Sequence, residues 1–533
     1  MSDVMMPLNL RHARTSVRYL DSSGISRGMF GGQTIVAARG GDRLALTLEM
    51  TKHGGRTTTG LAERAQLRAW LASLRGRQNP VFAQDKSRQR RGSFPTGELL
   101  ANNTFENGTT GWAASGEYAL TASDRLLRAT RTAVSSNQYA VRPSANVTVV
   151  QYAPYVMRYF VLQGRGAFAS GFTVDETVDA VVGAVNSTFG MMTAVTVPAT
   201  TAARPSLNDR VSSTFIAGDY IQVAYASMAR CALVDNAVNL LLRSDEFDNA
   251  SWTKTRCDVP NSQTAPDGTA TADTIREDST ASNTHLVVQS VAVASGAADY
   301  CFTVALKPSG RNWAVLEMHE GTNGANCYFN VSTGAVGTPT TGANWANLRT
   351  AVTDLGNGFY QCSITARKTS SSTSIACRIY LATADTTSSY SGNGTSAVIA
   401  WRATIAASSG PRRLTSTAAN NQGPASVSSM QTGSALYLRG LPASTNGLLE
   451  IDDQVEIITG RGSELKIVTA RLSSDAAGMG YLQFEPPLRT APVDGAPVII
   501  HQPMGRFLFS GDAVGFDNDP GVWTTASAEF EEA

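Results

Sequence analysis

Charge is scarce in this sequence, and the few charges it carries nearly cancel. Only 16% of the 533 residues are Asp, Glu, Lys or Arg, with 44 basic and 43 acidic side chains, whereas about a quarter is usual. Such a balance creates no large field of one sign that would attract an anionic polymer or lipid surface. We therefore expect no nucleic acid partner, and composition gives no electrostatic basis for binding to a membrane.

Long apolar runs are also missing. The first part of the chain is interrupted by Arg11, His12, Arg14 and Arg18, so no secretory signal peptide is expected there. No segment reaches the ~20 apolar residues that a transmembrane helix requires. The sequence predicts a product that is made and kept in a cytoplasm until something releases it, without insertion into a membrane.

Paired cysteines of the Cys-x-x-Cys type do not occur. The six cysteines are Cys231, Cys257, Cys301, Cys327, Cys362 and Cys377. Several stand in apolar, strand-like contexts such as residues 300–304, so we interpret them as buried free thiols that behave as small hydrophobic residues. Disulfide bonds are the alternative that an even number leaves open.

Catalytic and metal-binding motifs are equally hard to find. Only five histidines are present, and none has the His-Glu-x-x-His or His-x-His spacing of a zinc site. Neither a P-loop nor a Gly-x-Ser-x-Gly elbow occurs, and the adjacent Asp452 and Asp453 are more typical of turn chemistry than of a general acid and base. We expect no enzyme activity, no catalytic residue, no cofactor and no metal site; a structural calcium ion stays open, although no acidic cluster has suitable spacing.

Small residues and short strand patterns make up most of the chain, which is too long for a single core. Apolar residues alternate with polar ones in many segments, for example over residues 44–50, and residues 80–83 resemble a short strand. One helix is predicted near residues 67–74, where apolar residues recur at helical spacing. The expected fold class is mainly β.

One opening pattern occurs twice. A Leu-Leu pair, a short polar link, a Phe and a Trp appear at residues 99–112 and again at residues 241–252. The copies lie roughly 140 residues apart, a common domain size and far longer than a solenoid repeat. We predict two related antiparallel, jelly-roll-like β-sandwiches in tandem, with Phe247 and Trp252 in the core of the second.

The sequence on either side of this pair predicts a third unit. The amino-terminal segment offers too few elements for a secure core of its own, and the carboxy-terminal segment contains compact strands at residues 435–438, 455–458, 465–468 and 481–484. Because insertion into a surface loop is well tolerated, we predict one split β-rich belt or barrel domain; separate terminal domains are the alternative. The predicted division is 1–96 and 434–533 for the split domain, 97–236 and 237–407 for the two sandwiches, and 408–433 for a linker.

Aromatic residues on the second sandwich are the candidates for ligand binding. A flat ring can pack on the apolar face of a sugar while neighbouring amides and carboxylates bind its hydroxyl groups. The candidates are Trp345, Trp313, Tyr328 and Tyr360. Trp345 stands among the polar residues 342–347, an unusual context for a core Trp, although packing in the core is the alternative for Trp345, Trp313 and Tyr328.

The second sandwich resembles a family of carbohydrate-binding-like β-sandwiches that are appended to bacteriophage tail and spike proteins. The resemblance is carried by NLL at 239–241 with Phe247 and Trp252, then APDGTATAD at 265–273, FTVALK at 302–307, FNVSTG at 329–334 and GFYQC at 358–362. The first sandwich resembles a more distant member through its own opening pattern. These are framework and turn residues, so the resemblance implies a fold and a class of ligand but identifies no sugar contact.

The outer segments resemble the distal tail protein of long-tailed phages. The matching stretches are WLASLRG at 70–76, NPVF at 79–82, GLP at 440–442, FEPPLR at 484–489 and PMGRF at 503–507. The resemblance implies a ring of copies of this chain, hexameric in expectation, between the tail tube and the hub, with tail tube, hub and tape measure proteins as partners. Members with inserted modules direct them outward toward the host surface.

Together these patterns predict a structural component of a siphophage-type tail tip, synthesised in the host cytoplasm, that displays carbohydrate-binding modules toward host-surface glycans. A non-catalytic carbohydrate-binding adhesin or a receptor-binding spike protein is the alternative. A further alternative makes the inserted modules purely architectural. Replacement of Trp345 by Ala would separate the glycan hypothesis from that architectural one.

Overall fold

The described part of the chain, in a computed structural model, is built from β-strands. It comprises residues 4–5, 14–20, 24–27, 34–37, 43–54, 81–83, 90–95, 97–123, 126–133, 138–165, 169–173, 185–186, 190–198, 200–209, 217–235, 239–408, 410, 433–460, 462–510, 515–518 and 523–532. Every element assigned within these ranges is a strand, from β1 to β42, which confirms the mainly β fold class. The predicted helix near residues 67–74 and nearly all of the predicted linker lie outside the described residues.

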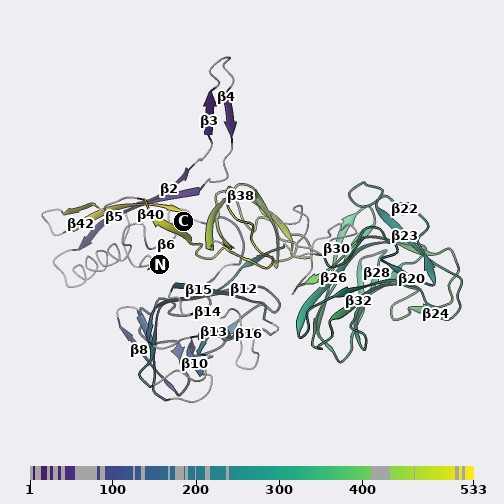
Figure 1. Cartoon of the computed structure of the whole chain (residues 1–533), viewed down its shortest axis with the longest axis horizontal. Helices are drawn as coiled ribbons and strands as arrows, with labels where there is room; N and C mark the ends of the chain where they lie inside the picture. Colours follow the sequence, from purple (N-terminus) through teal and green to yellow (C-terminus); the bar gives the residue numbers. More distant parts are fainter. Residues whose placement is uncertain are drawn as a thin grey trace.

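Strands from both ends of the chain share one seven-stranded sheet, called here the terminal sheet (Figure 1). Its order is β1-β6-β40-β42-β5-β2, with β41 paired to β42. β42 pairs antiparallel with β5, and β40 with β6. The strands are β1 (Val4–Met5), β2 (Arg14–Leu20), β5 (Arg43–Gly54), β6 (Val81–Ala83), β40 (Gly505–Phe509), β41 (Gly515–Asn518) and β42 (Trp523–Glu532); a separate hairpin is formed by β3 (Gly24–Arg27) and β4 (Thr34–Ala37). The strands predicted at residues 44–50 and 80–83 are therefore confirmed.

A closed six-stranded barrel follows in the carboxy-terminal part of the chain. Its strands are, in order, β19 (Ala232–Val234), β35 (Gly433–Arg439), β38 (Gly480–Leu488), β37 (Gly462–Val468), β36 (Gln454–Thr459) and β39 (Pro497–Ile499). The four strands predicted there are confirmed. The structure differs at β19, which comes from a segment that the sequence pattern assigns to the first sandwich: Leu233 pairs with Arg439 on one side and with Pro497 on the other.

The segment just before the first sandwich also packs on the barrel. Phe94 is fully buried in the barrel core, and its backbone N–H donates to the carbonyl of Leu448 at 2.9 Å. A Cβ on Gly92 would lie 2.2 Å from the Leu448 carbonyl oxygen, so only glycine permits this approach. The Asp453 carboxylate accepts backbone N–H bonds from Arg91 at 2.6 Å and Gly92 at 2.9 Å. Asp453 thus has the turn and bridging role that its sequence context predicts.

The first sandwich consists of two five-stranded sheets around an apolar core. One sheet contains β14 (Val185–Asn186), β13 (Ala169–Thr173), β17 (Ser206–Asp209), β10 (Gln138–Pro143) and β7 (Trp112–Ala113). The other contains β15 (Gly190–Thr196), β12 (Tyr155–Arg165), β18 (Tyr220–Arg230), β9 (Leu126–Arg131) and β8 (Tyr118–Ser123), and β11 (Val147–Thr148) pairs with β16 (Ala202–Ala203). Alternate residues of β12, such as Met157 and Tyr159, point into the core, as the period of two along a strand requires.

The other residues of β12 pack against the barrel. Phe160 and Tyr225 enclose Met504 in a small apolar cluster, and the Tyr225 hydroxyl donates to Gln502 Oε1 at 3.1 Å. The Arg158 guanidinium of β12 forms an ion pair with Glu456 of the barrel, and both side chains are almost wholly buried. The outer face of this sheet is therefore an internal interface.

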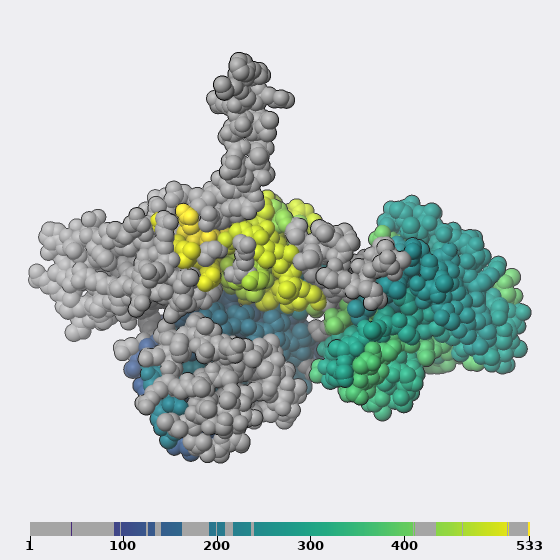
Figure 2. All heavy atoms as spheres, in the orientation of Figure 1, coloured from purple at the N-terminus to yellow at the C-terminus, as the bar shows by residue number. Residues whose placement is uncertain are grey.

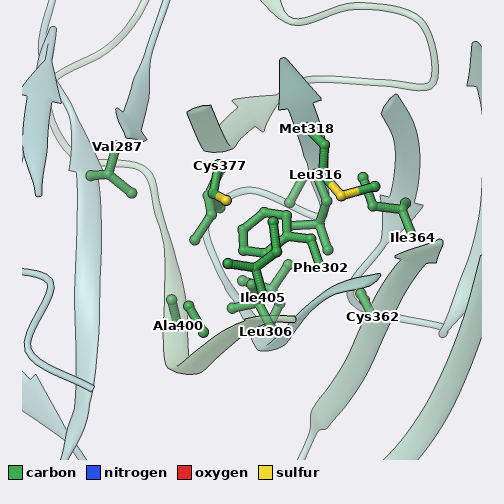
Figure 3. Packing of buried hydrophobic residues seen from close by; sticks show 14 of the residues in the cluster. Val287, Phe302, Leu306, Leu316, Met318, Cys362, Ile364, Cys377, Ala400 and Ile405 are labelled. Carbon is green, nitrogen blue, oxygen red and sulfur yellow. The ribbon is translucent and has the colours of Figure 1, made fainter. Parts of the chain in front are cut away.

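The second sandwich has a six-stranded and a seven-stranded sheet, all antiparallel. The six-stranded sheet contains β20 (Thr253–Thr255), β25 (Leu286–Ala292), β32 (Ser374–Ala382), β27 (Trp313–His319), β28 (Gly324–Asn330) and β29 (Ala335–Thr341). The seven-stranded sheet contains β21 (Cys257–Asp258), β23 (Ala272–Glu277), β34 (Ala397–Ala407), β26 (Ala298–Ser309), β31 (Phe359–Lys368) and β30 (Trp345–Gly356), with β22 (Ser262–Gln263) on β23; β24 (Asn283–Thr284) pairs with β33 (Ser389–Tyr390). Figure 3 shows side chains of both sheets, including Phe302, Leu316 and Ile405, meeting in one core.

The repeated opening pattern adopts the same local geometry in both sandwiches. The rings of Phe105 and Trp112 contact each other in a tilted arrangement at a centroid distance of 5.2 Å, and those of Phe247 and Trp252 do so at 4.8 Å. In each case the indole N–H donates at 3.0 Å to the carbonyl of a residue with positive φ, Asn102 in the first sandwich and Arg243 in the second. The prediction that Phe247 and Trp252 are core residues is confirmed.

The cysteines are free thiols in this structure, as predicted. Five of them are buried and Cys257 is half-buried, its Sγ donating to the Leu286 carbonyl at 3.0 Å. Burial raises the pKa of Cys257 to about 11. Among the described residues, no helix has the length and apolar character needed to cross a bilayer.

Candidate functional site

Trp345, a candidate in the sequence, is a core residue. Its side chain is only 5% exposed and belongs to the apolar core of the second sandwich, and its indole N–H donates to the Asn323 carbonyl at 3.1 Å. The polar residues around it are explained by the turn itself, because Asn344 donates to the Glu320 carboxylate at 2.8 Å. Of the two alternatives that the sequence leaves open for Trp345, the structure therefore supports packing in the core.

Tyr360 lies on the core side of the other sheet, away from the remaining candidates. It packs against the apolar core, half-buried, beneath the turn that joins β28 to β29. A Cβ on Gly334 in that turn, where φ is +73°, would lie 2.6 Å from the Tyr360 ring. The close approach of ring and turn indicates a structural role for this residue, and the structure does not bring it together with Trp313 and Tyr328.

Trp313 and Tyr328 do share a surface, the outer face of the six-stranded sheet. Their neighbours Ala314, Leu316 and Phe329 point into the core, so the alternate positions on β27 and β28 point outward. In the pairing of β27 with β28, Trp313 lies opposite Asn330, and Val315, two residues further along β27, lies opposite Tyr328. Both aromatic side chains are half-buried.

β32 adds a third aromatic residue and a charged pair to this outer face. Tyr380 lies opposite Val315, and Arg378 lies opposite Glu317. The Glu317 carboxylate accepts hydrogen bonds from Arg378 at 2.9 Å and from the Tyr380 hydroxyl at 2.8 Å. Burial and the charge of Glu317 raise the pKa of Tyr380 to about 12, so its hydroxyl stays protonated and remains a donor.

Glu317 reaches this position because a neighbouring residue has no side chain. A Cβ on Gly324 of β28 would lie 2.4 Å from Glu317 Oε1. The carboxylate therefore lies across the adjacent strand rather than extending into solvent. Its side chain is 12% exposed and that of Arg378 is 27% exposed, so both still reach the surface.

A loop fixes one edge of the outer face. Asp385 accepts hydrogen bonds from the backbone N–H and the hydroxyl of Thr338, both at 2.9 Å. Tyr328 hydrogen-bonds the hydroxyl of Ser388 at 3.1 Å. A Cβ on Gly337 would lie 2.8 Å from the Trp313 ring, so the strand packs closely against one edge of the indole, and the side chain as a whole is half-buried.

Tyr380, Arg378 and Glu317 are the residues of this face that sequence reasoning misses. A signal for them exists, because residues 374–381 alternate between outward and buried residues. That alternation shows only that Arg378 and Tyr380 share a side of their own strand. It does not reveal that β32 lies beside β27.

The chemistry available on the outer face is that of a binding surface. Three aromatic side chains can pack on apolar C–H groups, and the amides of Asn326 and Asn330, together with the Glu317–Arg378 pair, can donate and accept hydrogen bonds. Among the described residues, no group of three His, Cys, Asp or Glu side chains could hold a metal ion.

Comparisons with known proteins give only distant similarities. No protein-family model and no curated protein matches the chain. The solved structures similar to it include the CBM22-1–CBM22-2 tandem domain of Paenibacillus barcinonensis Xyn10C, which is 15% identical, covers 60% of this chain and 100% of that one, and has a TM-score of 0.21.

Two further structures are more distant. The CUB1-EGF-CUB2 domain of human MASP-1/3 is 12% identical, covers 55% of this chain and 98% of that one, and has a TM-score of 0.12. The M60 catalytic domain with two CBM51 domains from Clostridium perfringens ZmpB is 9% identical, covers 72% of this chain and 43% of that one, and has a TM-score of 0.13. Two of the three thus contain pairs of carbohydrate-binding modules, but similarities this weak carry no argument about the present chain.

Proposed function

We propose that this protein is a non-catalytic component of a siphophage-type tail tip that binds host-surface glycans through the outer face of its second sandwich. One observation carries the binding part of the proposal: Trp313, Tyr328 and Tyr380 lie on one sheet face beside the Glu317–Arg378 pair. Rings with hydrogen-bonding side chains beside them are what a sugar requires, since it has both apolar faces and hydroxyl groups.

The position of the second sandwich supports this role. Figure 2 shows it as a lobe that projects from the rest of the molecule. Its seven-stranded sheet faces the barrel and the first sandwich, because Arg349, Thr350 and Thr365 of that sheet line a cavity together with residues of both. The six-stranded sheet is on the opposite side of the sandwich, and the ion pair and hydrogen bonds described for its outer face join only residues of the second sandwich.

The scaffold supports the tail-tip part of the proposal. Both ends of the chain contribute strands to the terminal sheet, and the adjoining barrel is closed, with no free edge. Such a unit can form one repeated interface in a ring of identical copies, with tail tube, hub and tape measure proteins as neighbours. A ring that displays several weak glycan sites would gain avidity from their effective concentration.

The first sandwich has an architectural role in this proposal. Its sheet containing β12 and β18 is covered by the barrel, so that face cannot also meet a glycan. The proposal therefore assigns glycan binding to the second sandwich, and the covered sheet of the first sandwich extends the scaffold.

Binding is tested with a glycan array probed by the whole chain and by Trp313→Ala. Because an aromatic side chain at the centre of a binding surface contributes much of the affinity, we expect Trp313→Ala to weaken glycan binding by about tenfold or more. The matched control is Tyr481→Ala, which removes an aromatic side chain that is 53% exposed on the barrel and should leave binding unchanged.

The outcome that contradicts the glycan proposal is a whole chain that binds no glycan of cell-wall or capsular type, or equal binding by the wild type and Trp313→Ala. Trp345→Ala is not a usable test, because it would damage the core. Negative-stain images of the purified protein test the tail-tip part separately: rings with peripheral lobes are expected, and isolated particles at high concentration would contradict it.

A further inference from the structure

A cavity of about 260 Å³ lies where the two sandwiches and the barrel meet. Its walls come from the loop at residues 150–154 of the first sandwich, from β30 and β31 of the second, and from the barrel segments 439–443 and 476–478. Residues from three separately folded sheets therefore enclose one space.

Each of the three units contributes one arginine to this cavity. Arg230 is the last residue of β18 in the first sandwich, Arg349 belongs to β30 in the second, and Arg439 ends β35 in the barrel. None of the described residues that line the cavity is an Asp or a Glu. The lining thus gathers three cationic side chains with no carboxylate among them.

Acidic groups lie near two of the three arginines without lining the cavity. Asp494 forms an ion pair with the Nη2 of Arg439 at 3.8 Å. Asp299 acts on Arg349 through its charge but lies in an ion pair with Arg367 at 3.8 Å. Asp475, which precedes the cavity segment of the barrel, accepts the backbone N–H groups of its own turn at residues 477 and 479.

Arg349 is held by an aromatic contact, and Arg230 is partly buried at the cavity wall. The Arg349 guanidinium carbon lies 4.2 Å from the centre of the Tyr152 ring, a cation–π contact that joins the second sandwich to the first. Arg230 has a buried Nε with no hydrogen-bond partner among the described residues. Burial lowers the pKa of both arginines, which shows that their charges are desolvated.

We propose that this cavity is a binding site for a small molecule or ion that carries a phosphate group. Guanidinium groups match phosphate oxygens in geometry and charge, and an anion placed between three of them would offset the cost of burying cations. The remaining walls include Val197, Leu233 and Leu441, which leave room for a small organic body attached to the phosphate. Since each arginine comes from a different unit, the bound anion would also hold the three units in one arrangement.

The proposal is tested by isothermal titration calorimetry of the whole chain with inorganic phosphate, glucose 1-phosphate and glucose at constant ionic strength. We expect both phosphates to bind and glucose not to bind. The tighter of the two phosphates identifies the source, since a preference for glucose 1-phosphate indicates an organic phosphate and a preference for inorganic phosphate indicates the free ion.

Variants locate the site. Because a hydrogen bond to a charged group contributes substantially to binding, Arg230→Gln and Arg349→Gln should each weaken phosphate binding by about tenfold or more, and Arg230→Lys should weaken it less. The matched control is Arg471→Gln, which removes a barrel arginine that is 63% exposed and outside the cavity; its binding should equal that of the wild type. Far-UV circular dichroism confirms that each variant is folded.

The proposal is overturned if neither phosphate binds, if glucose binds as well as glucose 1-phosphate, or if both Gln variants bind phosphate as the wild type does. The titrations are repeated with Trp313→Ala as the background, so that any sugar bound at the outer face of the six-stranded sheet is separated from binding in the cavity. None of the substituted arginines lies on that outer face.

Discussion

The two sandwiches share an opening motif and a two-sheet core but use their outer faces differently. In the first, the outward residues of β12 include Val156, Arg158 and Phe160, which are 2%, 2% and 0% exposed because the barrel covers them. In the second, the outward residues of β27 and β28 include Trp313 and Tyr328, which stay half-buried. The two faces belong to different sheets of the shared fold, because the opening segment bonds to β18 in the first sandwich (Ala226 N–H to the Asn103 carbonyl at 3.0 Å) and to β34 of the seven-stranded sheet in the second (Ala403 N–H to the Ser244 carbonyl at 2.8 Å). That sheet meets its neighbours in both sandwiches, and the other sheet of the second sandwich remains a surface.

The ion pairs on the two faces follow the same division. Arg158 and Glu456 are buried between sandwich and barrel, where Glu456 also accepts hydrogen bonds from Ser463 at 2.6 Å and from the Met504 backbone at 2.7 Å. Arg378 and Glu317 lie at the surface of one sheet. Burial therefore determines how strongly the free energy of unfolding depends on each pair, because an uncompensated charge is costly only where water cannot reach it.

The largest effect should come from breaking the buried pair. Arg158→Ala leaves Glu456 buried without its cation, so we expect a loss of about 3–5 kcal/mol in the free energy of unfolding, measured by urea denaturation. The double variant Arg158→Met/Glu456→Met removes both charges and should recover part of that loss. The remainder reflects the buried Met504 N–H, which loses its acceptor. A double variant as unstable as Arg158→Ala would show that the pair is not what holds the first sandwich on the barrel.

A second prediction sharpens what the two sandwiches have in common. Trp112→Phe and Trp252→Phe each remove an indole N–H that bonds a backbone carbonyl at 3.0 Å and leave that carbonyl without its donor. We expect each substitution to lower stability by about 1–3 kcal/mol, with the two losses similar in size. Calorimetric unfolding of both variants checks this, and a loss confined to one sandwich would show that the repeated motif has lost its role in the other.

This motif is the part of the structure that the sequence predicts best. Phe247 and Trp252 recur with their spacing because the chain must close the same corner in each sandwich, and both are buried as expected. A strand with clear alternation, such as β5, is also predicted at the right place, since a period of two is a local property of the chain.

What depends on contacts between distant segments could not be predicted. β19 has three residues, which are too few for a periodic signal. Its place in the barrel is defined by pairing with Arg439 and Pro497, which lie about 200 to 260 positions further along the chain. The sequence context of Trp345 is polar because its turn bonds Glu320, a residue on another loop. Arg378 and Tyr380 lie on the same face as Trp313 only because β32 pairs with β27. The sequence of a single strand does not reveal that pairing.

A third prediction concerns pH and a buried carboxylate at one end of the second sandwich. Glu277 is 1% exposed and accepts hydrogen bonds from Arg311, Tyr390 and the Asn393 backbone at 2.5–2.9 Å. Burial alone would raise the pKa of Glu277, but these bonds outweigh it and hold the pKa below its ordinary value of 4.5. The unfolded chain therefore binds this proton more readily, and the stabilisation is lost as pH falls from about 4.5 through the folded-state pKa.

The measurement is the urea midpoint of the whole chain at several pH values between about 5 and 3. The midpoint of the wild type should fall more steeply with acid than that of Glu277→Gln, which has no proton to gain. Glu246→Gln, at a side chain that is 44% exposed in the same sandwich, is the control and should keep the wild-type slope. Parallel curves for wild type and Glu277→Gln would contradict the assignment.

The smallest effect on stability should come from Arg378→Ala, the counterpart of Arg158→Ala on the open face. Arg378 is 27% exposed and Glu317 can be solvated when its partner is removed, so we expect a loss of no more than about 1 kcal/mol by urea denaturation. A loss near that of Arg158→Ala would mean that the outer face of the second sandwich is an interface like that of the first. Because Arg378 orients Glu317 next to Tyr380, the same variant should nevertheless bind glycan more weakly, and a stable protein with reduced binding is the combination that only a ligand-binding surface explains.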